Sequence, residues 1–253
     1  MKSRSEQAAR HREARLPNPY VIVTGAAKGL GLSIAQLLAD QGYQIVGLGR
    51  NTSPAFESLG HQHEFLKFDL RELGEIKNLV SSIVKDLGAA PFGLVNNSGV
   101  GKDGVLATQH ERDIGEVLSV NLHAPILMSK YVSRQMVRQR SGRIINISSI
   151  IASTGFKGLA AYAASKAGLE GFTRSLSREV GPYGVTANCV APGFMRTDMT
   201  EKLTGQRLES VTRRAPLGLA EVKDVAQAVD FLLGPAASKI TGSVITVDGG
   251  STA

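Results

Sequence analysis

Residues 20–42 read YVIVTGAAKGLGLSIAQLLADQG, which predicts a buried strand, a glycine-rich turn and a helix in succession. The apolar run at 20–25 is typical of a strand covered on both faces of a sheet, and residues 32–42 have helical periodicity. In the turn, Gly25, Gly29 and Gly31 let the backbone approach a pyrophosphate, whose charge the following helix N-terminus favours. The spacing is not that of a P-loop. The turn therefore predicts dinucleotide binding, with an ordinary tight strand–helix turn as the alternative.

The same alternation of strand and helix continues to the C-terminus. It predicts an α/β fold, a Rossmann-type three-layer sandwich with a seven-stranded parallel sheet and helices on both faces. No repeat or linker divides the pattern, so residues 19–253 are predicted to form a single domain and the basic residues 1–18 a flexible extension. The six further strands are expected at 44–49, 64–70, 92–99, 143–148, 185–193 and 243–250. The later helices are expected near 71–87, at about 111–139, in a segment that carries Tyr162 and runs to about Val180, and at 221–233.

Composition narrows the class of protein. The 253 residues are 42% hydrophobic and 20% charged, as in a globular protein. No apolar run approaches the roughly 18 residues that span a bilayer, and the N-terminus lacks the apolar core of a secretory signal. A single cysteine, Cys189, excludes an internal disulfide and a multi-cysteine zinc site, and its apolar surroundings predict a buried strand position. We therefore expect a cytoplasmic protein without a metal site or a membrane partner.

The net charge of +7 requires that nucleic acid be considered as a partner. The basic residues are scattered, however, and no aromatic residues interleave with the charges of residues 1–18 as a base-stacking surface would require. The sequence therefore predicts no nucleic-acid partner. The positive surplus equally suits anionic small molecules or acidic carriers of a substrate.

Tyr162 and Lys166 are the candidate catalytic pair. On a helix, four residues turn roughly 400° and rise roughly 6 Å, so both side chains share one face. A cation beside a phenol lowers its pKa, which favours proton transfer near neutral pH. Ser149 follows the predicted strand RIINIS and is placed to add a hydroxyl to the pair. The alternative is a partly buried helix tyrosine and a lysine on a solvated face.

The residues after the second predicted strand indicate which dinucleotide binds. A carboxylate there would hydrogen-bond the ribose of NAD, whereas a cation would accept the 2′-phosphate of NADPH. This chain has Arg50 and Asn51 at that point, and Lys28 lies in the glycine turn. Two cations at one corner predict NADPH, with ordinary surface charges as the alternative. Asp69 is placed to contact the adenine.

TGAAKGLG, NNSG at 96–99, Ser149, the Tyr162/Lys166 pair and APG at 191–193 together resemble the short-chain dehydrogenase/reductase family over about residues 19–250. The resemblance implies that Tyr162 is the general acid, that Ser149 positions the substrate carbonyl, and that Lys166 holds the nicotinamide ribose and lowers the pKa of Tyr162. It also implies that Asn121 supports a proton-relay water and that Thr197 contacts the nicotinamide carboxamide. The predicted cofactor-binding residues are Thr24, Gly25, Lys28, Gly29, Leu30, Gly31, Arg50, Asn51, Asp69, Leu70, Asn97, Gly99, Tyr162, Lys166, Pro192, Gly193 and Thr197.

Within that family, APGFMRTDMT, RRAPLG and VDGG in the C-terminal third most resemble the 3-oxoacyl-[acyl-carrier-protein] reductases. The resemblance implies NADPH-dependent reduction of a 3-oxoacyl thioester, as in fatty-acid biosynthesis, by a homotetramer. Arg140 matches one basic residue that docks the carrier protein in that group, but Tyr183 replaces the second. The alternatives are the same chemistry on another ketone (a coenzyme A thioester, polyketide, sugar or steroid) and a non-catalytic NADP-binding scaffold.

Overall fold

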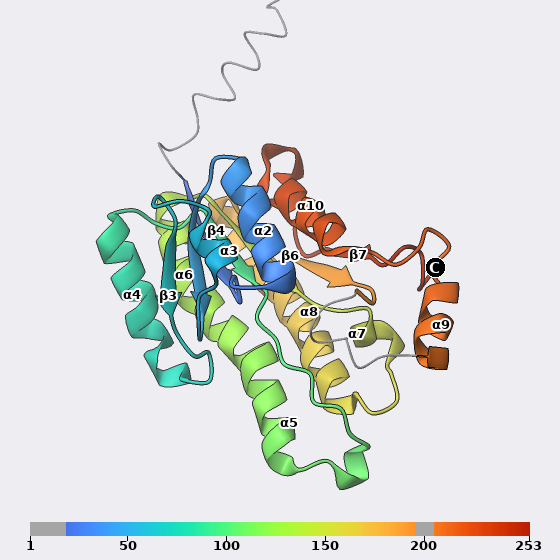
Figure 1. The fold of residues 1–253 in the computed structure, drawn as a ribbon. Helices are drawn as coiled ribbons and strands as arrows, with labels where there is room; N and C mark the ends of the chain where they lie inside the picture. Colours follow the sequence, from blue (N-terminus) through green and yellow to red (C-terminus); the bar gives the residue numbers. More distant parts are fainter. Residues whose placement is uncertain (1–18, 196–204) are drawn as a thin grey trace, which may run out of the picture.

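A parallel sheet of seven strands, in the order β3-β2-β1-β4-β5-β6-β7, forms the centre of the computed structural model, which describes residues 19–195 and 205–253 (Figure 1). Every neighbouring pair of strands is parallel. The α/β prediction is therefore confirmed. The strands are β1 (Tyr20–Thr24), β2 (Gln44–Gly49), β3 (Glu64–Lys67), β4 (Gly93–Asn96), β5 (Gly142–Ile147), β6 (Val185–Pro192) and β7 (Val244–Val247).

Helices cover both faces of the sheet (Figure 1). One face packs against α2, α3 and α10 through residues such as Ile34, Phe56 and Val229. The other packs against α4, α6 and α8 through residues such as Val80 and Met128. The α-helices are α2 (Gly29–Asp40), α3 (Pro54–Glu57), α4 (Ile76–Leu87), α5 (Glu111–Leu118), α6 (Ala124–Gln139), α7 (Ile151–Thr154), α8 (Ala160–Val180), α9 (Gly205–Arg213) and α10 (Val222–Leu233); the shorter turns are η1 (Leu73–Glu75), η2 (Leu106–Thr108), η3 (Ser119–His123), η4 (Gly181–Tyr183) and η5 (Pro235–Ala237).

The strand order reverses between β1 and β4. From β1 the chain builds outward through β2 and β3 on one side and, after crossing back, through β4 to β7 on the other. In open parallel sheets, ligands bind at the carboxyl ends of the strands beside such a reversal. The glycine turn after β1 and the NNSG segment after β4 meet at this point.

The helix predicted over 111–139 is interrupted at its centre. Residues Ser119–His123 form a π-helical turn between α5 and α6. Pro125 lacks an N–H group, so the carbonyl of Asn121 four residues earlier does not receive the usual α-helical hydrogen bond. A single π turn inserted into a helix often marks a functional site, and this one contains a predicted catalytic residue.

A chain of buried polar side chains runs through the sheet below the predicted site. The amide of Asn96 donates to Asn146 Oδ1 (2.8 Å), and the amide of Asn146 donates to Thr173 Oγ1 (2.8 Å). The thiol of Cys189 donates to the same hydroxyl (3.2 Å), and burial raises its pKa to about 12. Cys189 thus occupies the buried strand position that the sequence predicts.

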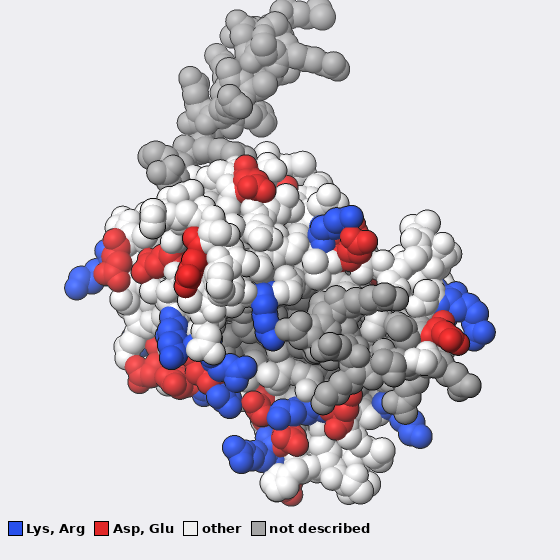
Figure 2. All heavy atoms as spheres, viewed as in Figure 1, with Lys and Arg blue, Asp and Glu red and all other residues white. Residues whose placement is uncertain are grey.

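Two further findings concern the described residues alone. No helix among them is both long and apolar enough to span a membrane. Nor do they contain a cluster of three or more His, Cys, Asp or Glu side chains that would hold a metal ion. On the face drawn in Figure 2, Lys and Arg side chains are interspersed with Asp and Glu rather than joined in one basic patch.

Candidate active site

Tyr162, Lys166 and Ser149 come together where β5 ends and α8 begins. Both α8 residues lie in its first two turns, and the Lys166 Nζ atom is 5.7 Å from the centre of the Tyr162 ring. The Ser149 hydroxyl lies near enough to the Tyr162 phenol to lower its pKa. The backbone N–H of Ile151 donates to Ser149 Oγ (3.2 Å) and so fixes the hydroxyl. The three groups that the sequence predicted to act together therefore share one site.

Lys166 is buried, with 3% of its surface exposed, so its alternative reading as a solvated surface lysine is wrong. Its ammonium donates to the carbonyl of Ile147, the last residue of β5, at 2.7 Å. Burial disfavours the charged form and lowers the pKa of Lys166 to about 8. The side chain is thus a fixed cation whose charge is lost within a mildly alkaline range.

The pKa of Tyr162 differs from the sequence-based expectation. Burial raises the pKa of this phenol, and the neighbouring Ser149 hydroxyl lowers it by a smaller amount. The net pKa of Tyr162 thus lies above its ordinary value and not below it, because desolvation of the phenolate is the larger effect. The phenol therefore remains protonated at neutral pH, the state that a general acid requires.

Asn121 is fully buried, and both the oxygen and the nitrogen of its side-chain amide are hydrogen-bonded within the protein. Its Oδ1 accepts the N–H of Val100 at 2.8 Å, and its Nδ2 donates to the Val100 carbonyl at 3.0 Å and to Ser165 Oγ at 3.3 Å. The side chain thereby ties the segment after β4 to α8. A Cβ on Gly99 would lie 3.4 Å from Asn121 Oδ1 and 3.7 Å from Lys166 Nζ, so glycine keeps the space above both groups open.

The glycine turn is shaped for a close backbone approach. A Cβ on Gly31 would lie 2.0 Å from the Gly25 carbonyl oxygen, so only glycine fits where β1 and α2 meet. Gly29 has a φ of +54°, and nothing within 4 Å would contact a Cβ there, which leaves the turn open to a ligand. The helix N-cap is Lys28, whose side chain cannot accept the free N–H groups, and the first turn contains no carboxylate. These features fit a pyrophosphate.

Thr24 and Asn97 join the two halves of the sheet. Thr24 Oγ1 accepts the N–H groups of Asn97 (3.0 Å) and Ser98 (2.9 Å), while Asn97 Nδ2 donates to the carbonyl of Thr24 at 2.9 Å. Their side chains therefore hold the glycine turn against the NNSG segment, a structural task that the sequence analysis did not assign to them.

Asp69 also has a protein partner. Its carboxylate accepts from the guanidinium of Arg71, and this hydrogen bond, with a smaller effect of Arg50, lowers the pKa of Asp69 against the opposing effect of burial. Leu70 beside it is buried in the core and Leu30 packs against the core on the opposite face. Any contact of Asp69 with adenine would be made beside an existing ion pair.

At the end of β6, Pro192 and Gly193 are fixed by backbone contacts. The Pro192 carbonyl accepts the N–H of Ile150 at 3.0 Å, and a Cβ on Gly193 would lie 2.6 Å from the Cβ of Asp248. The first contact joins the segments after β5 and β6 beside Ser149, and the second holds Gly193 against the residue that follows β7. Thr197 lies outside the described residues.

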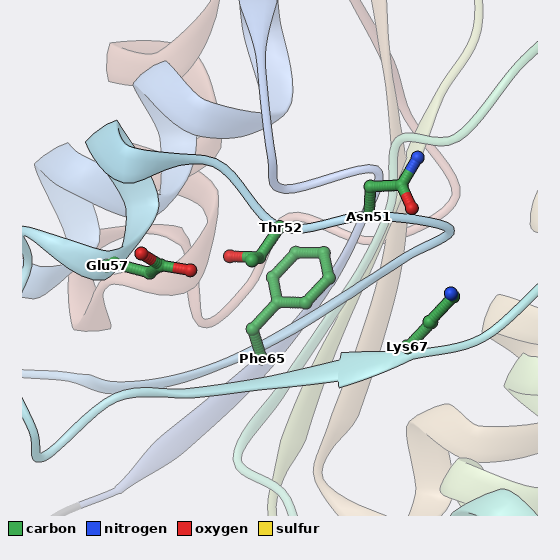
Figure 3. A pocket seen from close by; sticks show the side chains of 5 residues that line it. All are labelled: Asn51, Thr52, Glu57, Phe65 and Lys67. Atoms are coloured by element: carbon green, nitrogen blue, oxygen red, sulfur yellow. The ribbon is translucent and has the colours of Figure 1, made fainter.

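Arg50 and Asn51 follow β2, and both are exposed. The hydroxyl of Ser53 donates to the carbonyl of Ala27 at 2.6 Å, which holds this loop against the glycine turn. Beside the loop lies a pocket of about 400 Å³ lined by Asn51, Thr52, Glu57, Phe65 and Lys67 (Figure 3). Lys67 is a cation that the sequence analysis missed. Its position as a basic residue within the strand predicted at 64–70 was the available signal.

Comparison with known proteins agrees with this arrangement. Residues 25–252 match the family described as Enoyl-(Acyl carrier protein) reductase. The 3-oxoacyl-[acyl-carrier-protein] reductase FabG of Vibrio cholerae is 37% identical over 239 residues, which cover 93% of this chain and 98% of the relative. The enzymes of the same name from Escherichia coli K12 (36% over 233 residues; 90% and 95% covered) and Pseudomonas aeruginosa (37% over 242 residues; 93% and 98%) are similar too. The chain therefore belongs to the short-chain dehydrogenase/reductase family and is an oxidoreductase that uses a nicotinamide cofactor.

Proposed function

We propose that this protein reduces 3-oxoacyl thioesters, carried by acyl carrier protein, to 3-hydroxyacyl thioesters with NADPH. The observation that carries the proposal is the buried Lys166 beside Tyr162, with the Ser149 hydroxyl near the phenol, in a chain similar over nearly its whole length to reductases of that name. A protein that only binds a dinucleotide has no need of a buried ammonium, because desolvating it costs free energy.

The chain's residues would hold the pyrophosphate and the nicotinamide ribose of the cofactor at two separate places. The open turn at Gly29 and the N-terminus of α2 suit the pyrophosphate. The space kept free by Gly99 above Asn121 and Lys166 suits the nicotinamide ribose. When bound, the cofactor supplies the hydride that the keto carbon receives.

Tyr162 and Ser149 would act on the keto oxygen of the substrate. Two hydroxyl groups hold that oxygen by hydrogen bonds, and Tyr162 Oη donates a proton to it as negative charge develops. Lys166 stabilises the resulting phenolate, since its ammonium is fixed by Ile147. Asn121 contributes through its backbone carbonyl, which Pro125 leaves without an α-helical hydrogen bond. That carbonyl is thus able to hold a water molecule that returns the proton to Tyr162.

The choice of NADPH rests on charge at the end of β2. Arg50 is exposed there, and no carboxylate occupies the position that would bind the ribose hydroxyls of NAD. Lys28 precedes α2 on the neighbouring turn. A phosphate monoester favours such a cationic corner, and a free 2′-hydroxyl gains little from it.

Docking of an acidic carrier protein would involve Arg140. This residue ends α6 with a φ of +55°, and its guanidinium donates to the Pro182 carbonyl (3.2 Å) and lies 5.7 Å from the centre of the Tyr183 ring. Tyr183 therefore holds the arginine at the surface rather than adding a second charge. Arg140→Glu is expected to raise KM for the carrier-protein substrate several-fold and to leave KM for a coenzyme A thioester unchanged.

A homotetramer is part of the proposal, and exposed apolar residues support it. Leu217 is 89% exposed and Phe231 on α10 is 44% exposed, so both apolar side chains are available to contact another subunit. Light scattering coupled to size-exclusion chromatography measures the assembly directly, and a monomer would contradict it.

The test of the proposed function is NADPH oxidation with acetoacetyl-carrier protein and acetoacetyl-coenzyme A, beside a sugar ketone and a steroid ketone. Tyr162→Phe should lower kcat by about 10²- to 10⁴-fold and leave NADPH binding unchanged. The matched control is Tyr131→Phe, which removes a phenol oxygen on α6, away from the site. Turnover of the other ketones alone would assign the same chemistry to another substrate. Full activity of Tyr162→Phe would overturn the assigned mechanism.

A further inference from the structure

We propose that Lys67, at the end of β3, binds the 2′-phosphate of NADPH and is a selectivity residue for this cofactor. The inference rests on the proposed use of NADPH and assigns part of that preference to a residue outside the glycine turn and outside the end of β2. It is carried by the pocket between β2, β3 and α3 (Figure 3).

Strand register places Lys67 beside the cofactor corner. In the parallel pair β2–β3, Lys67 is directly opposite Gly49, the residue before Arg50. Its side chain therefore starts level with the point where β2 gives way to the loop Arg50–Ser53. Because Ser53 is bonded to Ala27, that loop also lies against the glycine turn that precedes α2. Three cations from three segments, Lys28, Arg50 and Lys67, thus surround one short loop.

The pocket exists because two glycines in β2 leave room for an aromatic ring. A Cβ on Gly47 would lie 3.0 Å from Phe65 Cδ2, and one on Gly49 would lie 3.0 Å from Phe65 Cζ. The ring instead lies against β2 and packs edge-on against Phe56, with centroids 5.1 Å apart. Figure 3 shows Asn51 and Lys67 on one side of this ring and Thr52 and Glu57 on the other. The pocket therefore has a cationic end and an anionic end.

The charge at the cationic end is available to a ligand. Among the residues that the structure describes, no carboxylate lies within ion-pair distance of Lys67, and Glu57 is not its partner. The nearby carboxylate of Asp69 is already paired with Arg71. A dianionic phosphate between Arg50 and Lys67 would receive charge-assisted hydrogen bonds from both and would lie apart from Glu57.

The test measures binding rather than turnover. Calorimetric titration compares 2′,5′-ADP with 5′-AMP, two fragments that differ only in the 2′-phosphate, on the wild type, Lys67→Ala, Lys67→Arg and Arg50→Ala. The matched control is Lys77→Ala, which removes an exposed lysine of α4 on the other face of the sheet. Lys67→Ala should weaken binding of 2′,5′-ADP by about five- to tenfold and binding of 5′-AMP by less than about twofold, and Lys67→Arg should retain the preference.

The outcomes separate this inference from the proposed function. If the wild type prefers 2′,5′-ADP and Lys67→Ala binds as tightly as Lys77→Ala, Lys67 has no part in selectivity and NADPH use stands. If Lys67→Ala weakens both fragments equally, the residue shapes the pocket without reading the phosphate, and the inference is overturned. If the wild type binds both fragments equally, the NADPH assignment itself fails and Lys67 has nothing to select.

Discussion

Lys166, in the candidate active site, and Lys67, in the pocket proposed for the cofactor's 2′-phosphate, stand in opposite surroundings. Lys166 is 3% exposed, donates to a strand carbonyl and has its pKa lowered to about 8 by burial. Lys67 is exposed at the end of a four-residue strand and has no carboxylate partner among the described side chains. The same contrast holds for their neighbours, because Asn121 has all its amide hydrogen bonds inside the protein whereas Arg50 is exposed.

The difference indicates a division of labour. Groups that carry out the chemistry are held rigid at a cost in stability, since their charges and polar atoms are buried. Groups that choose the cofactor are exposed, cost little, and act only when a ligand brings a matching charge. Substitutions of the buried catalytic groups should therefore alter activity and stability together, and substitutions of the exposed groups that choose the cofactor should alter cofactor affinity alone.

The largest expected effect comes from Lys166→Met, which keeps the length of the side chain and removes its charge. We expect kcat to fall by about 10²- to 10³-fold, while the free energy of unfolding at pH 7 stays the same or increases, because a buried ammonium is replaced by an apolar group. Steady-state kinetics and urea denaturation measure the two quantities. A variant that is active, or that is strongly destabilised, would break the comparison.

Next in size is the dependence of stability on pH. The pKa of Lys166 is about 8 in the folded protein, compared with about 10.4 for an unperturbed lysine. Below pH 8 both states bind the proton and the folded state bears the full cost of burying it, about 3 kcal/mol. Between about pH 8 and pH 10.4 the folded state loses the proton first, so stability from this group rises with pH. In urea titrations across that interval, the free energy of unfolding of the wild type should therefore rise relative to that of Lys166→Met. If the two free energies change with pH in parallel, the lysine is not desolvated.

Asn121→Ala should have an intermediate effect. It leaves both the N–H and the carbonyl of Val100 without their side-chain partner, which is expected to cost about 2 kcal/mol of stability. Since Asn121 also ties the segment after β4 to α8, kcat should fall by roughly tenfold as that segment loosens. Thermal denaturation and kinetics at saturating NADPH test this. Asn51→Ala is the matched control, because it removes the same kind of side-chain amide from an exposed position and should leave stability unchanged.

The smallest expected effect is that of Glu57→Gln at the anionic end of the pocket. Removing a like charge near a bound phosphate should tighten 2′,5′-ADP by about twofold at low salt, and the gain should shrink as salt screens the interaction. Titrations at two ionic strengths measure the effect. Weaker binding would mean that Glu57 holds the nucleotide rather than repelling its phosphate.

The sequence predicted correctly those features in which residues lie at a fixed spacing along the chain. Tyr162 and Lys166 meet because four helical residues bring them to one face, and Gly31 is required by a backbone contact that any turn of this kind makes. The sheet followed from runs of apolar residues alternating with amphipathic helices. These features depend on local geometry, which residue order encodes directly.

Other features depend on tertiary packing and could not be predicted in this way. The pKa of Tyr162 is raised because other segments bury it, a quantity that the spacing to Lys166 does not contain. The π turn at Ser119–His123 inserts one extra residue into a single turn of the long helix. This change is too short to disturb the apolar periodicity of that helix in the sequence. Lys67 resembled a solvent-facing strand residue until the register placed it opposite Gly49.

The buried thiol of Cys189 has a practical consequence for labelling. It is the chain's one cysteine, and burial together with a pKa raised to about 12 keeps the reactive thiolate scarce at neutral pH. A cysteine introduced at an exposed position such as Lys77 would therefore react with a maleimide dye while Cys189 stays unmodified. The native sequence thus serves as its own background for fluorescence measurements at single sites, with no need to remove a cysteine from the core.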